Sequence, residues 1–169
     1  GKQLALKVIR PELIANPKDR ARFDQVFKKM REVRHDNVAA VGETGEHNGF
    51  VFITEEYFPG QSLRQLMDEY QAQQKVFSLQ EACQIVLKVL EASHYLHGQG
   101  VIHRDLKPEN VLVHSRATGP GGKTIVRTIK ISDAGFADIL NPSIFAEGFV
   151  SRVEARYLAP ELASFEHIG

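Results

Sequence analysis

Three polar side chains near the middle of the chain, Asp105, Lys107 and Asn110, have types that suit chemistry on a phosphate group. A carboxylate can accept a proton, an ammonium group supplies positive charge, and an amide oxygen can ligate a hard cation. The three functions together suit the movement of a highly charged group. The simpler alternative is a salt-bridged surface turn, which polar residues this close in sequence also form.

The sequence on either side of these residues predicts how they are held in place. Two short runs rich in β-branched residues, Val101-Ile102 and residues 111–113, bracket the polar stretch, and Pro108 lies inside it. This pattern is typical of a strand, a loop and a second strand. We therefore expect a loop with anchored ends.

The composition is that of an ordinary soluble domain with a buried core, with 169 residues of which 43 % are hydrophobic and 25 % charged. The formal charge of 21 − 21 = 0 gives no reason to expect nucleic acid or a membrane surface as partner. No apolar run reaches the roughly 18–20 residues of a membrane span, and no signal peptide is visible. Cys83 is the only cysteine and falls in an apolar helical pattern, which predicts a packed thiol and is compatible with a reducing compartment.

Several segments predict the elements that surround this loop. Residues 4–9 alternate as a strand that places Ala5, Lys7 and Ile9 on one face. Asn16-Pro17 predicts the start of a helix with an apolar side formed by Phe23, Val26, Phe27, Met30 and Val33. Residues 50–54 predict a second strand, and residues 56–60 a connector.

The second half of the chain predicts two helices and a hairpin. Ser62 is expected to cap a short helix through Tyr70, and residues 78–81 form a capping box that opens a longer helix. The expected apolar side of the longer helix comprises Ala82, Ile85, Val86, Val89, Leu90 and Leu96. Residues 115–123 predict a polar hairpin tip, and residues 125–131 a strand that leads to Asp133.

The ordered string H-R-D-L-K-P-E-N at residues 103–110 resembles the catalytic loop of the protein kinases, and Lys107 is typical of the serine/threonine branch. A-L-K-V-I at residues 5–9, D-A-G at 133–135 and A-P-E at 159–161 follow the family's order. The resemblance implies an α+β, two-lobed fold that is only partly present. Residues 1–58 would be the remainder of the small lobe and the hinge, and residues 59–169 the first part of the large lobe.

The resemblance also implies a function and its residues. Transfer of the γ-phosphoryl group of ATP to a Ser or Thr hydroxyl of a protein would use Asp105, Lys107 and Lys7 as catalytic residues, with Mg²⁺ held by Asn110 and Asp133. Cofactor-binding residues would be Ala5, Lys7, Glu55, Glu56, Tyr57, Phe58, Asn110, Leu112 and Asp133. The expected location is cytoplasmic, with a membrane anchor elsewhere in a longer parent left open, and nothing indicates an oligomeric state.

Three positions depart from the kinase pattern. Val26 stands where the family has a glutamate that pairs with the strand lysine, and we hypothesise that Glu55 replaces it as the partner of Lys7. Ala134 replaces a phenylalanine that fills a column of apolar side chains between the lobes, and either Met30 or Phe136 is a candidate to fill the space. The third departure is Glu154, which stands where a threonine is usual.

These departures keep a second hypothesis open, a pseudokinase that acts as an interaction module and retains nucleotide binding. A third, small-molecule phosphotransfer, shares the aspartate and asparagine of the loop, but Lys107 and the A-P-E segment argue against it. Arg104 is a candidate receptor for a phosphate placed on Ser143 or Ser151. The glycine-rich phosphate loop and the base of the large lobe are not in this sequence, which predicts that residues 1–169 alone are inactive.

Overall fold

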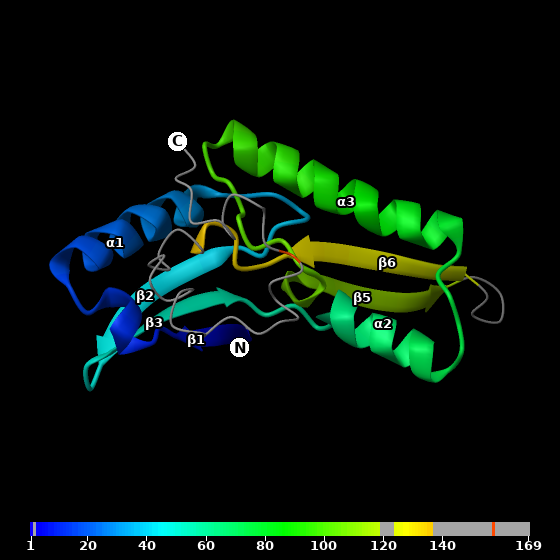
Figure 1. Ribbon diagram of the computed structural model, residues 1–169, viewed down its shortest axis with the longest axis horizontal. Helices are drawn as coiled ribbons and strands as arrows, with labels where there is room; N and C mark the ends of the chain where they lie inside the picture. Colours follow the sequence, from blue (N-terminus) through cyan, green and yellow to red (C-terminus); the bar gives the residue numbers. More distant parts are fainter. Residues whose placement is uncertain (2, 119–123, 137–156, 158–169) are drawn as a thin grey trace.

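The computed structural model describes residues 1, 3–118, 124–136 and 157, which form two three-stranded antiparallel sheets joined by a short connector (Figure 1). The elements are, in chain order, β1 (Leu4–Val8), the 3-10 turn η1 (Pro11–Ile14), α1 (Pro17–Glu32), β2 (Val41–His47), β3 (Phe50–Glu56), β4 (Gln61–Ser62), α2 (Leu63–Ala72), α3 (Leu79–Gly98), the 3-10 turn η2 (Pro108–Asn110), β5 (Val111–Thr118) and β6 (Thr124–Ile131).

The first sheet has the strand order β1-β3-β2 and is covered by α1 (Figure 1). The side chain of Asn16 caps α1 by accepting a hydrogen bond from the backbone amide of Asp19 at 2.9 Å, as the sequence predicts. The buried face of α1 includes Phe23, Phe27 and Met30. Strand β1 alternates as expected, and its Lys7 face is half-buried while the opposite apolar face is exposed.

The second sheet has the order β4-β5-β6, and α3 runs along β6 (Figure 1). Both predicted helix starts are confirmed, because Ser62 and Ser78 each form a capping box, with Gln65 and Glu81 respectively. These caps satisfy backbone amides that have no partner inside the helix. The two sheets share one hydrophobic core, so the chain between them is held on both sides.

Two local predictions for the second half are wrong. Val101-Ile102 is not a strand, because no strand in the described residues pairs with it; Val101 is instead tied to the end of α3 by its amide, 2.9 Å from the oxygen of Leu96. The polar tip predicted at residues 115–123 is shorter, because the β5–β6 ladder continues to the pair Thr118 and Thr124. Pairing between the two strands outweighs the turn-like composition there.

The exposed side of α3 also differs from the prediction. Val86 and Leu90 are 55 % and 58 % exposed, whereas Ile85, Ala92 and Leu96 are buried. Successive residues of a helix are about 100° apart around its axis, so Val86 projects away from the side on which Ile85 is buried. Cys83, predicted to be packed, is exposed.

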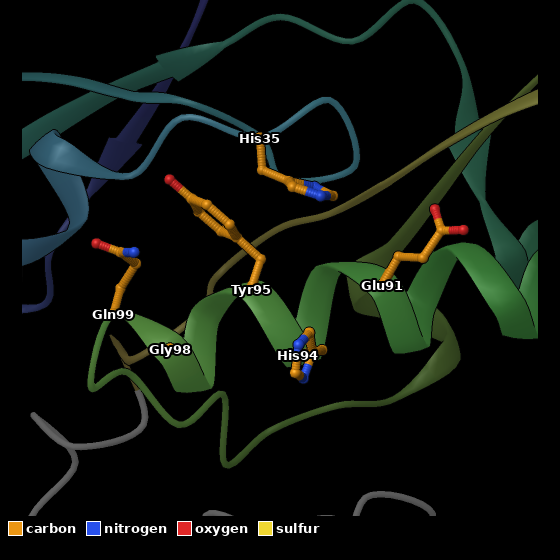
Figure 2. A pocket seen from close by; sticks show the side chains of 6 residues that line it. All are labelled: His35, Glu91, His94, Tyr95, Gly98 and Gln99. Carbon is orange, nitrogen blue, oxygen red and sulfur yellow. The ribbon is translucent and has the colours of Figure 1, made fainter.

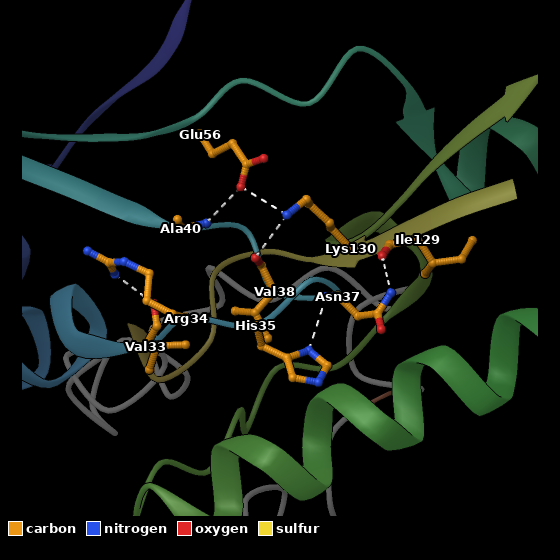
Figure 3. A network of polar contacts seen from close by, with 9 residues as sticks. All are labelled: Val33, Arg34, His35, Asn37, Val38, Ala40, Glu56, Ile129 and Lys130. Carbon is orange, nitrogen blue, oxygen red and sulfur yellow. Dashed lines mark hydrogen bonds and ion pairs between the residues drawn. The ribbon is translucent and has the colours of Figure 1, made fainter.

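Residues 37–40 tie the end of β6 to the first sheet (Figure 3). The side chain of Asn37 donates to the oxygen of Ile129 at 2.8 Å, and its backbone oxygen accepts from the amide of Ile131 at 2.9 Å. The amide of Ala39 returns a bond to the oxygen of Ile131 at 2.9 Å. Consequently the strand that leads to Asp133 has a fixed position relative to the loop before β2.

Lys130 extends this connection to β3 (Figure 3). Its Nζ lies 3.0 Å from an oxygen of Glu56 and 3.4 Å from the oxygen of Val38, and the amide of Ala40 donates to the same Glu56 oxygen at 3.3 Å. Glu56 lies inside β3 rather than in the connector predicted at residues 56–60, so the connector begins at Tyr57. The ion pair therefore fixes the strand end from which the connector departs.

Candidate active site

The amine of Lys7 lies between two carboxylates from distant parts of the chain. Lys7 Nζ is 2.6 Å from Glu55 Oε2 and 2.6 Å from Asp133 Oδ1. Glu55 lies on β3, opposite Ala5 of the neighbouring strand β1, and is only 4 % exposed. The structure therefore contains the hypothesised pair between Glu55 and Lys7, and no described residue of α1 forms an ion pair with Lys7.

Burial and neighbouring charges act in opposite directions on the pKa values of Lys7 and Glu55. Burial lowers the pKa of Lys7, but the nearby charges of Glu55 and Asp133 outweigh it and hold that pKa above its ordinary value. Burial raises the pKa of Glu55 above its usual range, although Lys7 opposes that effect. The Lys7 ammonium is thus kept charged in a partly desolvated position between two carboxylates.

The predicted catalytic loop forms a second polar group. Lys107 Nζ is 3.1 Å from Asp105 Oδ2, and the side-chain amide of Asn110 donates to Asp105 Oδ2 at 3.0 Å and to its backbone oxygen at 2.8 Å. Asn110 is buried at the end of η2, where Pro108 fixes the start of the turn. Because the amide nitrogen faces Asp105, the amide oxygen Oδ1 is the atom of Asn110 that can ligate a cation.

The second sheet brings the two groups together. Asn110 directly precedes β5 and Asp133 follows β6, and these strands pair with Val111 opposite Ile131. The amide of Ser132 donates to the backbone oxygen of Asn110 at 2.9 Å. Asp133 has a φ of +62°, a left-handed backbone conformation that changes the direction of the chain directly after Ser132. Side chains far apart in the sequence thus converge at one end of the β5–β6 hairpin.

The residues present fit a magnesium ion. Asp133 offers a carboxylate and Asn110 an amide oxygen, and Mg²⁺ in phosphate-transfer sites is typically held by one or two protein groups together with phosphate and water. No group of three or more His, Cys, Asp or Glu in the described part of the chain is arranged to hold a metal by itself. His103, the first residue of this loop, is buried, and that burial lowers the pKa of its imidazole.

The turn that carries Asp133 packs against α1. Ala134 is 1 % exposed and Met30 is 1 % exposed, and a Cβ built at Gly135 would lie 3.8 Å from Met30 Sδ and 3.5 Å from Val26 Cγ1. Phe136 is only partly buried, at the edge of the core. Of the two candidates for the space beside Ala134, Met30 is therefore the fully enclosed one.

The remaining predicted nucleotide contacts lie on the elements expected for them. Ala5 is half-buried on β1 and Leu112 is half-buried on β5, whereas Tyr57 is exposed in the connector. Phe58 meets the ring of His114 edge-on, with centroids 6.3 Å apart. The predictions for Ser143, Ser151, Glu154 and the A-P-E segment concern residues outside the described part of the chain.

The structure adds a contact that sequence reasoning missed. Arg64 of α2 lies with its Nε 3.4 Å from Glu109 of η2, and its NH2 group donates to the hydroxyl of Tyr157 at 2.8 Å. Arg64 therefore supports the loop of residues 103–110 through Glu109. Nothing in the local sequence signals this pairing, because the partners are far apart in the chain and meet only through packing of α2 on η2.

A separate hollow of about 440 Å³ lies along the C-terminal half of α3, where the ring of His35 faces Tyr95 at a centroid distance of 4.8 Å (Figure 2). Its lining consists of His35, Glu91, His94, Tyr95, Gly98 and Gln99. None of these residues belongs to the Lys7 or the Asp105 group. The hollow is therefore distinct from the polar groups at the end of the β5–β6 hairpin.

Comparison with known proteins gives a consistent result. The protein kinase domain family matches over residues 1–169. The chain is 35 % identical to the serine/threonine-protein kinase pkn3 of Myxococcus xanthus, over 96 % of this chain and 29 % of that protein. It is 33 % identical to the inhibitor of nuclear factor kappa-B kinase subunit beta of mouse, over 96 % of this chain and 21 % of that protein.

Solved structures agree with the sequence relatives. The crystal structure of the Mycobacterium tuberculosis PknI kinase domain superposes with a TM-score of 0.68 and 26 % identity, over 98 % of this chain and 56 % of that one. The chain thus spans less than a third of these curated relatives and about half of that kinase domain. No helix in the described residues is long and apolar enough to cross a membrane.

Proposed function

This chain belongs to the protein kinase family, and on that premise we propose that it is the catalytic part of an ATP-dependent protein serine/threonine kinase. The observation that carries the proposal is the meeting of Lys7 and Asp133, 126 residues apart, at 2.6 Å. This pair lies beside the Asp105–Asn110 group, to which the Ser132–Asn110 backbone bond connects it. Residues 1–58 serve as part of the small lobe with the hinge, and residues 59–169 as part of the large lobe.

Each polar group has a role in in-line phosphoryl transfer. Asp105 orients the substrate hydroxyl and accepts its proton, and Lys107, 3.1 Å from it, stabilises negative charge on the group being transferred. Lys7 exchanges its contact with Asp133 for the phosphates of ATP. Magnesium, held by Asp133 and Asn110, supplies neutralisation of phosphate charge when bound.

The adenine ring is assigned to the region between the two sheets. Backbone groups of Glu56, at the end of β3, and of the connector residues Tyr57 and Phe58 bind the polar edge of the adenine. Ala5 and Leu112 contact the faces of the ring. Ala5 is suited to this because its side chain is small and shares a face of β1 with Lys7, two residues away. The substrate is a protein, and the site of action is the cytoplasm.

A second candidate, a nucleotide-binding pseudokinase, is favoured by the apolar side chains at the turn. Val26 faces Gly135 from α1, and Ala134 fills the position next to Asp133 with the smallest apolar side chain. Val26 supplies no charge for Lys7, and Ala134 lacks the ring that kinases usually have beside the metal-binding aspartate. This candidate shares nucleotide binding with the kinase and differs from it in the absence of phosphate transfer.

Radiolabel transfer from ATP by the full-length protein decides between the two. We expect Asp105→Asn to lower kcat by about 10²–10⁴-fold, because it removes the proton acceptor. The control is Asp24→Asn, which removes an exposed carboxylate of α1 that pairs with Arg20. Equal labelling by wild type and Asp105→Asn would rule out the kinase function, and nucleotide binding without any labelling would favour the pseudokinase.

A further inference from the structure

The partner of Lys7 comes from the strand next to it and not from the helix above it. Glu55 Oε2 is 2.6 Å from Lys7 Nζ, and β1 and β3 are hydrogen-bonded neighbours whose register sets Ala5 opposite Glu55 and Lys7 opposite Ile53. Because both residues stand on one sheet, their separation is set by strand pairing. A movement of α1 would leave that separation unchanged.

Helix α1 does not offer a competing charge. Two uncharged side chains of α1 face the Asp133–Gly135 turn: Val26 Cγ1 lies 3.5 Å and Met30 Sδ 3.8 Å from the position of a Cβ on Gly135. The acidic residues of α1 have other surroundings: the carboxylate of Asp19 accepts from the side-chain amide of Asn16, Asp24 pairs with Arg20, and Glu32 is exposed. Among the described residues, Glu55 is thus the carboxylate that can hold Lys7 when Asp133 binds something else.

The contact with Asp133 makes this role necessary. In the structure Lys7 bridges Glu55 and Asp133, both at 2.6 Å. When Asp133 turns to a cation, its attraction for Lys7 is shared with that cation and weakens. An ammonium group without a second partner would follow Asp133 or leave the site. Glu55, which is 4 % exposed, is the second partner that remains beside Lys7.

From this geometry we infer that Glu55 is a positioning residue that holds Lys7 for the phosphates of the nucleotide and makes that alignment independent of helix α1. The inference rests on the proposed function, in which Lys7 binds those phosphates. A positioning role differs from a purely structural role of Glu55 because it requires only a negative charge beside Lys7, whichever element supplies that charge. A carboxylate moved to α1 should therefore replace Glu55.

The test uses the full-length protein and measures the affinity for Mg²⁺ with a non-hydrolysable ATP analogue by calorimetry, alongside kcat and KM for ATP. Glu55→Gln keeps the shape of the side chain and removes its charge, and we expect about a ten-fold weaker affinity, the size of losing one charge-assisted contact. The matched control is Glu46→Gln, which changes an exposed carboxylate on β2 of the same sheet that pairs with Arg20; this variant should bind the nucleotide as the wild type does.

The decisive variant is the double change Val26→Glu with Glu55→Gln, which moves the charge to α1. Recovery of most of the lost affinity supports positioning by charge, and a double variant no better than Glu55→Gln overturns it. Should melting curves show that the double variant does not fold, Glu55→Asp decides instead: affinity within about three-fold of wild type supports the inference, and a loss equal to that of Glu55→Gln refutes it.

The outcome is separable from that of the proposed function. A wild-type protein that binds the nucleotide and labels no substrate contradicts the kinase proposal, while the comparison of Glu55→Gln with Glu46→Gln still tests Glu55. Conversely, normal phosphate transfer and unchanged nucleotide affinity in Glu55→Gln contradict the positioning role and leave the kinase proposal intact.

Discussion

Packing between Met30 and the Ala134 turn predicts a specific pattern of stabilities. Both side chains are 1 % exposed, and Met30 Sδ lies 3.8 Å from the Cβ position of Gly135. Ala134→Phe introduces a ring where no space is present, so we expect the free energy of unfolding to fall by about 1–3 kcal/mol. Met30→Ala opens a cavity and should lower it by about 2–5 kcal/mol.

Combining the two changes distinguishes this account from a general weakening of the core. The ring of Ala134→Phe can enter the space vacated by Met30→Ala. The double variant should therefore lose less unfolding free energy than the two single variants lose in sum, by at least about 1 kcal/mol. Denaturant unfolding measures the free energy of unfolding of the wild type, the two single variants and the double variant, each with the complete kinase domain. Additive effects within about 0.5 kcal/mol, or a stabilising Ala134→Phe alone, would show that Met30 does not occupy the space.

Three further stability predictions concern the start of helix α3 and the contact between β6 and β3. Ser78→Ala should cost about 1 kcal/mol through loss of the capping box, measured by denaturant unfolding, and an unchanged midpoint would contradict it. The backbone amide and hydroxyl of Ser78, with Arg127, lower the pKa of Glu81 to about 2. Since the folded-state pKa lies below the ordinary 4.5, this stabilisation is complete above pH 4.5 and is lost as the pH falls towards 2, so the stability difference between wild type and Glu81→Gln should shrink over that range. Lys130→Met removes the 3.0 Å contact with Glu56 and should destabilise by about 1–2 kcal/mol in the same assay; equal midpoints would show that the pair does not secure the end of β3.

Local elements were predictable wherever a residue acts on its immediate neighbours. Asn16, Ser62 and Ser78 cap their helices as expected because an N-cap bonds to an amide two or three residues away. The alternation of β1 was also predictable, since successive residues of a strand face opposite sides. The short pair Val101-Ile102 was not, because a strand requires a partner that the local sequence does not reveal.

The candidate site divides in the same way. The order and types of Lys7, Asp105, Asn110 and Asp133 are readable in the chain, and Glu55 could be proposed as a partner of Lys7 because Val26 lacks a charge. The support given by Arg64 to Glu109 and by Lys130 to Glu56 could not be read, since each pair joins elements remote in sequence.

By itself the sequence determined which groups are available for chemistry, because side-chain type sets proton affinity, charge and ligand preference. Only the tertiary structure decided how Lys7 divides its contacts, with Glu55 and Asp133 each at 2.6 Å, and that Met30 lies against the turn that contains Ala134. The physical reason is that hydrogen-bond distances and close packing depend on strand register and helix placement, to which residues throughout the chain contribute at once.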